Sequence, residues 1–176
     1  MNCLTNRLLL KDIELFNFIY TKARCKFSNC FMSYITHLGG AVFTITLPVL
    51  LIIFGDQKLD QVAFEMLLVL LSSNLFVHII KRIVNRSRPY RVLEDIDLVK
   101  IPFEEYSFPS GHTTASFSLA ITLSFFFPSL SFLFLSLSFL VGLSRIYLGV
   151  HYPSDVIIGI LISIVFSLAI HFNSIS

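Results

Sequence analysis

The sequence has little charge. Only 14% of its 176 residues are charged, whereas 55% are hydrophobic, and the mean hydropathy is +0.80. A soluble domain usually carries about 25% charged and about 45–50% apolar residues, so this composition does not fit one. The apolar residues form long blocks, and a helix needs about 20 of them to cross a bilayer core of about 30 Å. The composition therefore predicts a polytopic membrane protein.

Cysteine is also scarce, and no charge of either sign dominates. The three cysteines are Cys3, Cys25 and Cys30. Their odd number argues against a disulfide framework, and no histidine follows at zinc-finger spacing, so we expect free thiols. The net charge is only +2, and the basic residues lie between hydrophobic blocks. Nucleic acid is therefore not an expected partner, because its binding needs a basic face.

The first 33 residues are mixed in polarity. Their apolar residues recur at helical intervals, with charged residues between them: Leu8, Leu9, Ile13, Phe16 and Ile19, interrupted by Lys11, Asp12 and Glu14. This interruption excludes a cleavable signal peptide and predicts an amphipathic helix on the membrane surface. A span here would bury charges at about 2.5–3.5 kcal/mol each. The sequence leaves open whether residues 8–30 form a sixth span.

The remaining residues, 34–176, are predicted to form a transmembrane domain. Five spans are expected, over 34–54, 62–83, 112–127, 130–148 and 155–172. The expected fold class is thus all-α, a polytopic transmembrane helical bundle preceded by the amphipathic segment 1–33. Five spans place the end of the second, the start of the third, the end of the fourth and the start of the fifth on one membrane face.

Polar residues inside the second span need a separate explanation. They are Glu65, Ser72, Asn74 and His78. Because a polar side chain in hydrocarbon is unfavourable, we expect all four to face the interior of the bundle.

Three polar clusters lie at the shared membrane face, over residues 81–89, 109–112 and 144–155. Lys81, Arg88 and Arg145 would bring three cations to the edge of the hydrocarbon layer. Each could extend to lipid headgroups separately. A shared phosphate would explain all three together, since arginine offers paired donors and lysine a point charge.

The second cluster contains Ser110, Gly111 and His112, where a helix is expected to begin. Free backbone N–H groups and a partial positive charge at a helix start favour a bound anion. Gly111 would let the backbone approach that anion closely, and Ser110 would add a hydroxyl donor. A simple serine cap followed by a glycine turn would produce the same pattern without a ligand.

Two histidines in these clusters suggest acid–base and nucleophilic chemistry. His151 and Asp155 are four residues apart at a loop-to-helix junction, so the carboxylate can hold one ring nitrogen as N–H and leave the other free to attack phosphorus. His112 can protonate the leaving group and later activate water. The surrounding cations argue against a bound metal ion and could stabilise the developing charge themselves.

The three clusters together resemble the signature of the type 2 phosphatidic acid phosphatase superfamily. That signature reads Lys-x6-Arg-Pro, Pro-Ser-Gly-His and Ser-Arg-x5-His-x3-Asp. The matching residues are Lys81, Arg88, Pro89, Pro109, Ser110, Gly111, His112, Ser144, Arg145, His151 and Asp155. No position departs from the pattern, and the resemblance covers residues 34–172.

The resemblance implies a helical core shared with vanadium haloperoxidases and bacterial acid phosphatases. It also implies a phosphohistidine mechanism without metal or other cofactor. By this resemblance His151 attacks, Asp155 orients it and His112 is the acid. The residues expected to bind the phosphoryl oxygens are Lys81, Arg88, Ser110, Gly111 and Arg145.

The resemblance further suggests a lipid-linked phosphate as substrate and the bilayer as environment. Small bacterial members often act on undecaprenyl diphosphate, which is the expected substrate here. Phosphatidylglycerophosphate and phosphatidic acid would undergo the same chemistry. Two further classes of protein fit these residues, a lipid phosphotransferase and a non-enzymatic lipid transporter or scaffold. The sequence does not indicate the oligomeric state.

Orientation is the point on which two arguments conflict. The resemblance places the site on the extracytoplasmic face of a bacterial cell membrane. The basic residues, however, concentrate on the catalytic side and in the first 33 residues, with only Lys58 on the opposite face. The positive-inside rule would therefore put the site in the cytoplasm. We favour the extracytoplasmic face, because phosphate binding requires several of those cations.

Overall fold

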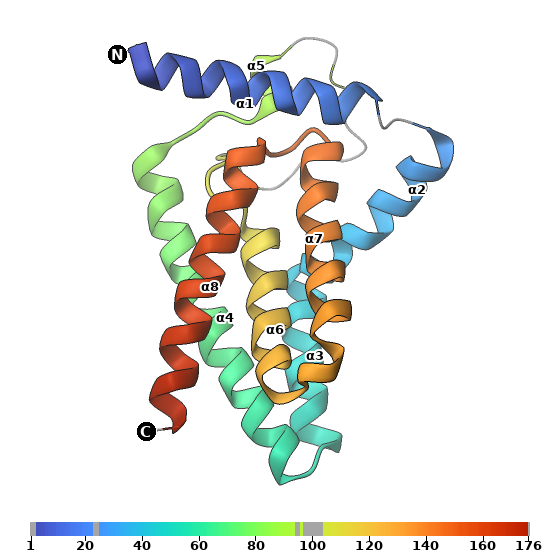
Figure 1. The fold of residues 1–176 in the computed structure, drawn as a ribbon, viewed down its shortest axis with the longest axis vertical. Coiled ribbons are helices and arrows are strands. Elements are labelled where there is room, and N and C mark those ends of the chain that lie inside the picture. The colour runs from blue at the N-terminus through green and yellow to red at the C-terminus, as the bar shows by residue number, and fades with distance from the viewer. Residues whose placement is uncertain (1–2, 23–24, 94–95, 97–103, 176) are drawn as a thin grey trace.

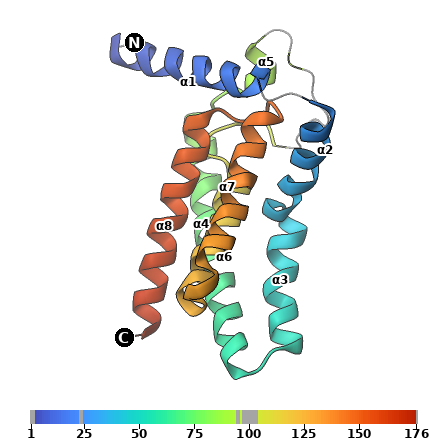
Figure 2. The same cartoon turned by 45° about the vertical axis from the view of Figure 1, so that its right-hand side comes forward.

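The computed structural model describes residues 3–22, 25–93, 96 and 104–175, which form helices and contain no strand. The elements in chain order are α1 (Cys3–Lys22), α2 (Lys26–Ile35), η1 (Thr36–Gly39), α3 (Ala41–Phe54), α4 (Gln57–Val84), α5 (Pro89–Val92), α6 (Gly111–Phe126), η2 (Pro128–Leu130), α7 (Ser131–Tyr147) and α8 (Pro153–Ile175). Helices α3, α4, α6, α7 and α8 run along one common direction (Figures 1 and 2).

Helix α6 is central, because it contacts α3, α4, α7 and α8. Small and hydroxyl residues make this close packing possible, as in other membrane helix interfaces. The Ser138 hydroxyl donates to the Ser116 carbonyl over 2.9 Å, and the Thr114 hydroxyl lies 3.2 Å from the Gly159 carbonyl. These contacts join α6 to α7 and α8, respectively.

The predicted all-α, multi-span architecture is confirmed. Three segments are long and apolar enough to cross a membrane: Gln57–Val92, Pro128–Tyr147 and Pro153–Ser174. A fourth candidate is a pair of helical stretches, Phe27–Gly39 and Ala41–Phe54, bent by 52°. Helix α6 has 16 residues and lies enclosed among the others. The count of five spans stays a prediction.

The first predicted span, 34–54, is not one straight helix. Gly39 ends η1 and Gly40 is extended, with φ −76° and ψ 153°, before α3 begins. A Cβ on Gly39 would lie 2.6 Å from the His112 carbonyl oxygen and 2.7 Å from a Val141 methyl group. The chain therefore bends where its backbone meets α6 and α7. The predicted division of the chain between residues 33 and 34 falls inside α2 and stays a prediction.

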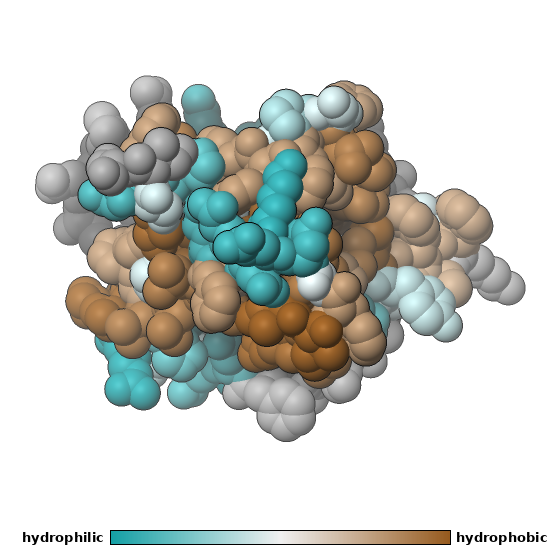
Figure 3. Space-filling view, turned by 90° about the horizontal axis from the view of Figure 1, so that it is seen from below, coloured by the Kyte–Doolittle hydropathy of each residue, from teal (hydrophilic) through white to brown (hydrophobic). Residues whose placement is uncertain are grey.

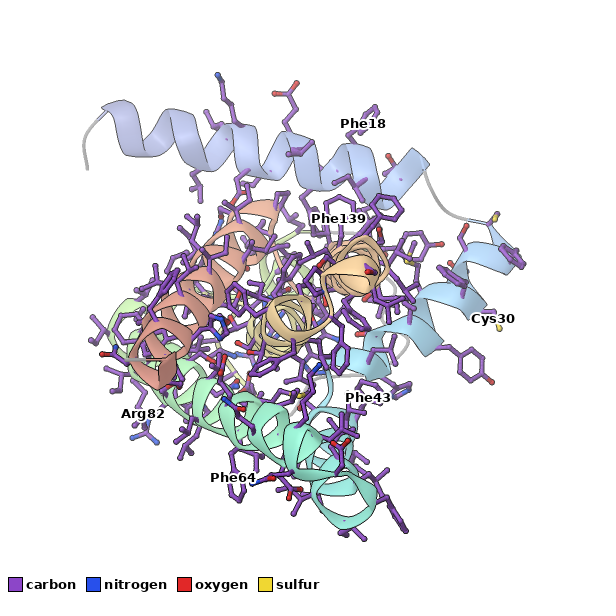
Figure 4. All side chains as sticks on the ribbon, turned by 60° about the horizontal axis from the view of Figure 1, so that its bottom comes forward. Phe18, Cys30, Phe43, Phe64, Arg82 and Phe139 are labelled. Atoms are coloured by element: carbon purple, nitrogen blue, oxygen red, sulfur yellow. The ribbon has the colours of Figure 1, made fainter. Side chains whose placement is uncertain are left out.

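The sides of the bundle are apolar. Phe43, Phe64 and Phe139 point outward from their helices in Figure 4, and Phe132 is 86% exposed. Large exposed apolar surfaces are rare on soluble proteins but normal against lipid. Seen from the end opposite the polar clusters, hydrophilic side chains gather in the middle of a largely hydrophobic surface (Figure 3). The α3–α4 turn at this end exposes Asp56 and Lys58.

The polar residues of α4 differ in their surroundings. Glu65 is buried, as predicted, and its Oε1 lies 2.9 Å from Nδ1 of His171 on α8. The prediction was wrong for His78, whose side chain is 60% exposed. His78 instead lies 3.9 Å from a carboxylate oxygen of Glu104. Its polar partner comes from the loop before α6 rather than from the interior.

Helix α1 lies across the end of the bundle at which α7 ends and α8 begins (Figures 1 and 2). Phe16 and Tyr20 are buried there in a cluster with Ile146, Tyr152 and Val156. Other side chains of α1, such as Phe18, point away from the bundle (Figure 4). Residues 3–22 thus form the helix expected from their pattern, whereas its place relative to the bilayer stays a prediction.

Candidate active site

The three sequence clusters meet at one end of the bundle (Figure 1). Lys81 lies in the last turn of α4 and Arg145 in the last turn of α7. Ser110 caps the start of α6, and Asp155 lies in the first turn of α8. The predicted sharing of one face by these four helix ends is therefore observed.

A tight turn between α7 and α8 places His151. The backbone N–H of His151 donates to the Arg145 carbonyl over 3.2 Å, which folds the chain back onto the end of α7. Gly149 has φ 76°, a conformation that side-chain-bearing residues rarely adopt. The turn buries His151 almost completely, leaving 1% of it exposed.

The two ring nitrogens of His151 have different neighbours. Nδ1 lies 3.4 Å from Oδ2 of Asp155, and Nε2 lies 3.3 Å from Nη1 of Arg88. A guanidinium group only donates hydrogen bonds, so Nε2 must present its lone pair to Arg88. The proton of the neutral ring is then on Nδ1, facing the carboxylate. The free lone pair therefore points toward the cationic part of the site.

The environment also keeps this imidazole neutral. Burial, followed by the positive charges of Arg88, Arg145 and Lys81, holds the pKa of His151 well below its usual value. Protonation would place a further cation among existing ones without water to stabilise it. His151 therefore keeps its lone pair at neutral pH.

The arginines of the site donate to oxygen acceptors that leave part of each guanidinium free. Arg88 donates from Nε to the Glu104 carbonyl over 3.0 Å and from Nη1 to the Val150 carbonyl over 3.1 Å. Arg145 donates to the Thr36 hydroxyl over 2.8 Å, and its buried Nε has no hydrogen-bond partner among the described residues. A buried donor without a partner is costly, and a bound phosphoryl oxygen would satisfy it.

The start of α6 lies against the same site. Ser110 is buried and its backbone N–H donates to the Asp155 carbonyl over 3.1 Å. A Cβ on Gly111 would lie 4.0 Å from Nζ of Lys81, so this glycine borders the ammonium group. His112 interacts electrostatically with Arg145 and His151. All eight predicted site residues thus gather at this end of the bundle.

Sequence reasoning missed the role of Glu104, which lies in the loop before α6 and outside the three polar clusters. Its carboxylate forms an ion pair with Lys81 and lies 3.7 Å from Nη2 of Arg88. Burial alone would raise the pKa of the Glu104 carboxyl, but the charges of Lys81 and Arg88 outweigh it and lower that pKa. Glu104 is 48% exposed. The cations Lys81 and Arg88 have no acidic partner within their own cluster, and this could have predicted an acidic side chain from another part of the protein.

Three other acidic residues of this loop, Glu94, Asp95 and Asp97, lie outside the described residues. Arg86 is a second missed residue, because its guanidinium donates to Oδ1 of Asp155 over 2.7 Å. Among the described residues, no three or more His, Cys, Asp or Glu side chains form a group that could hold a metal ion.

The fold and the site together define a membrane-embedded helical bundle with cations around a neutral, oriented histidine. The family model of the PAP2 superfamily matches residues 62–173, and the chain belongs to this superfamily.

Two solved structures share the fold. The crystal structure of Aquifex aeolicus LpxE has a TM-score of 0.79 at 31% identity, and the match covers 90% of this chain and 93% of that one. The PAP2 type phosphatidylglycerolphosphate phosphatase of Bacillus subtilis also has a TM-score of 0.79, at 27% identity, covering 96% of this chain and 87% of that one.

Curated relatives match over shorter stretches. The lipid A 1-phosphatase of Rhizobium johnstonii is 32% identical over 54% of this chain, and the match spans 41% of that protein. The undecaprenyl-diphosphatase of the archaeon Sulfolobus acidocaldarius is 26% identical over 74% of this chain and 63% of its own length. The names of these relatives share one chemistry and differ in the lipid.

Proposed function

We propose that this chain is a membrane lipid phosphatase that forms a phosphohistidine at His151. The observation that carries the proposal is the orientation of the imidazole, with Nδ1 facing Asp155 and the Nε2 lone pair facing Arg88. A nucleophile needs a free lone pair and a group that holds it in place. Membership of the PAP2 superfamily supports the same chemistry.

In the first step, Nε2 of His151 attacks phosphorus and the bond between phosphorus and the lipid oxygen breaks. The proton on Nδ1 stays on the ring, and its positive charge faces Asp155. His112 gives a proton to the departing oxygen, so that the lipid leaves as an alcohol or as a lipid monophosphate. Lys81, Arg88 and Arg145 stabilise the charge on the phosphoryl oxygens, as preorganised donors do in other transfer sites.

In the second step, water replaces the histidine. His112, now neutral, takes a proton from the water as its oxygen attacks phosphorus. The bond between phosphorus and Nε2 breaks, and inorganic phosphate leaves. His151 returns to its neutral state with the proton on Nδ1. The chain's own residues therefore supply the nucleophile, the acid–base group and the charge stabilisation for both steps.

Undecaprenyl diphosphate is the substrate that we propose first. The support is the family resemblance of the sequence and the likeness to an undecaprenyl-diphosphatase over 74% of the chain. Lipid A carrying a 1-phosphate is the second candidate. The observation that favours it is the likeness to the lipid A 1-phosphatase of Rhizobium johnstonii, which is 32% identical over 54% of this chain.

The test is phosphate release by the purified protein in detergent, with excess EDTA. Undecaprenyl diphosphate, lipid A, phosphatidylglycerophosphate and phosphatidic acid are compared by kcat/KM. We expect turnover with at least one of them, and removal of the nucleophile in His151→Ala should abolish it. Full turnover by that variant would refute the mechanism. Phosphate appearing on a second lipid instead of in solution would indicate a phosphotransferase.

A further inference from the structure

A chain of ion pairs joins helix α1 to the carboxylate that faces His151. Oδ2 of Asp12 on α1 lies 2.7 Å from Nη2 of Arg86, and Nη1 of Arg86 lies 2.7 Å from Oδ1 of Asp155. Asp155 then faces Nδ1 of His151 with its other oxygen, at 3.4 Å. Asp12 and His151 are thus linked through two intervening side chains.

The ion pairs of this series are held at several points. Asp12 also accepts hydrogen bonds from the backbone N–H and the hydroxyl of Ser154, the first at 2.9 Å. The Ser154 hydroxyl in turn accepts from Arg86 over 2.7 Å, and the Arg86 guanidinium lies 4.0 Å from the centre of the Tyr152 ring. Arg86 therefore has anions on two sides and an aromatic face against it, which leaves its guanidinium little freedom.

These ion pairs are also largely shielded from water. The side chain of Asp155 is fully buried, that of Asp12 is 9% exposed and that of Arg86 is 18% exposed. Ion pairs on open surfaces contribute little, but pairs shielded in this way are strong and directional. The guanidinium is thus a fixed donor that determines how the Asp155 carboxylate lies.

A purely structural clamp is the competing interpretation, since the same contacts fasten α1 to the start of α8. The placement of the contacts argues for more than that. Asp155 is held at Oδ1 by Arg86 and at Oδ2 by the backbone N–H of Tyr152 over 2.9 Å. With both oxygens fixed, the carboxylate presents Oδ2 to Nδ1 of His151 from one direction. Without Arg86, the carboxylate loses its ion pair and keeps the hydrogen bonds from the Tyr152 N–H and the Ser107 hydroxyl.

We propose that Asp12 and Arg86 are positioning residues for catalysis, which act through Asp155 to orient the nucleophile His151. This inference rests on the proposed function, because it takes His151 as the nucleophile. Helix α1 lies outside the residues that match the family model, 62–173. It nevertheless supplies Asp12, the last side chain in this series of ion pairs. Helix α1 is thus part of the proposed catalytic unit.

Asp12→Asn, Arg86→Lys, Arg86→Gln and the double variant Asp12→Asn/Arg86→Gln test the proposal in the full-length protein. Glu14→Gln is the matched control, because Glu14 is an exposed acidic residue on the same helix. For each variant, kcat, KM, the single-turnover rate of phosphohistidine formation and the melting temperature are measured. Lipid substrate is supplied in the detergent micelles that support wild-type turnover.

We expect Asp12→Asn to lower kcat and the phosphohistidine rate about tenfold and Arg86→Gln about a hundredfold, as misplacement of a reacting group does. KM should change less than about twofold, since the substrate contacts remain. The double variant should be no slower than Arg86→Gln, because both substitutions interrupt the same series of ion pairs. Arg86→Lys, which keeps the charge, should fall between Asp12→Asn and Arg86→Gln.

Unchanged kcat in Asp12→Asn and Arg86→Lys, with only a lower melting temperature, would overturn the inference in favour of a structural clamp. Additive losses in the double variant would also overturn it. His151→Ala separates this failure from failure of the proposed function. If His151→Ala is inactive while Asp12→Asn is fully active, only the positioning role is wrong. If His151→Ala keeps its activity, the proposed function is wrong.

Discussion

At the scale of single residues, one carboxylate of the protein offsets part of the positive charge of the site. Lys81 and Arg88 bring positive charge into a poorly hydrated region, and the Glu104 carboxylate lies against both. Under the proposed function, a phosphate would have to displace this carboxylate from Lys81 and Arg88. We therefore expect Glu104 to weaken the binding of phosphate.

Replacing Glu104 by glutamine should strengthen anion binding. The amide keeps the size of the side chain but loses the charge that competes for Lys81 and Arg88. We expect the inhibition constant of orthovanadate, which mimics the transferring phosphoryl group, to fall about threefold to tenfold, or about 0.7–1.4 kcal/mol. Glu105→Gln is the control, since Glu105 pairs with exposed Arg91 at 3.2 Å. Weaker inhibition in Glu104→Gln would contradict the competition.

The protonation state of His151 can be observed directly. Because burial and the neighbouring cations lower its pKa, the ring should stay neutral as the pH falls through the usual value for histidine. In nitrogen NMR of histidine-labelled protein, its signals should not move between about pH 8 and about pH 6, whereas an unperturbed histidine titrates near pH 6.5. The His151→Ala spectrum assigns the signals. A midpoint near pH 6.5 would show that the cations do not act on this ring.

At the scale of secondary-structure elements, the short helix η1 connects α6 and α7 to the site. Gly39 lies against the His112 carbonyl, while Thr36 accepts a hydrogen bond from Arg145. The bend between η1 and α3 therefore has a functional consequence. It brings the Thr36 hydroxyl to Arg145 and places α3 against the first turn of α6.

Gly39→Ala should damage this arrangement. A methyl group 2.6 Å from the His112 carbonyl oxygen requires backbone movement, so we expect a loss of about 1–3 kcal/mol of stability and a several-fold lower kcat. Gly40→Ala is the neighbouring control, because its nearest atom would lie at 3.2 Å. Thermal unfolding and phosphate release measure the two effects. Equal effects of both substitutions would contradict the importance of the Gly39 contact.

At the scale of the whole molecule, the site, α1 and the start of α2 lie at the same end of the bundle (Figures 1 and 2). The side of the membrane that this end faces decides which phosphates it meets. The charge distribution favours the cytoplasm, and the family resemblance favours the opposite side. Several of the basic residues pair with acids, as Arg86 does with Asp12 and Asp155. Basic residues that are paired with acids in this way are weaker evidence for a cytoplasmic location of the site.

Labelling of single cysteines in intact bacterial cells tests the orientation. Cys25 caps α2 at the catalytic end, and hydrogen bonds from Ser28 lower the pKa of its exposed thiol, which favours reaction. With Cys3 and Cys30 replaced by serine, an impermeant maleimide should label Cys25. Lys58→Cys in a protein without native cysteines marks the other end and should stay unlabelled until the cells are opened. The reverse pattern would place the site in the cytoplasm.

The sequence motifs alone selected the candidate site residues, and the apolar composition predicted the helical class. Long apolar blocks can only form helices in lipid, and the helix ends between them follow from local sequence. The spacing from Arg145 through His151 to Asp155 spans one turn and one helix start, so its geometry is also local. For the same reason, the ranges predicted for the later helices agree closely with α6, α7 and α8.

Tertiary packing decided what local sequence does not encode. Arg86 meets Asp155 across 69 positions and Asp12 across 74, distances over which periodicity carries no information. Glu104 reaches Lys81 from a loop, and Gly39 bends the chain because the His112 carbonyl lies next to it. Lone charges and single glycines acquire their roles only from neighbours that folding brings close. The residue that we propose as nucleophile could therefore be selected from its motif, whereas its neighbours Arg86, Asp12 and Glu104 emerged only from the fold.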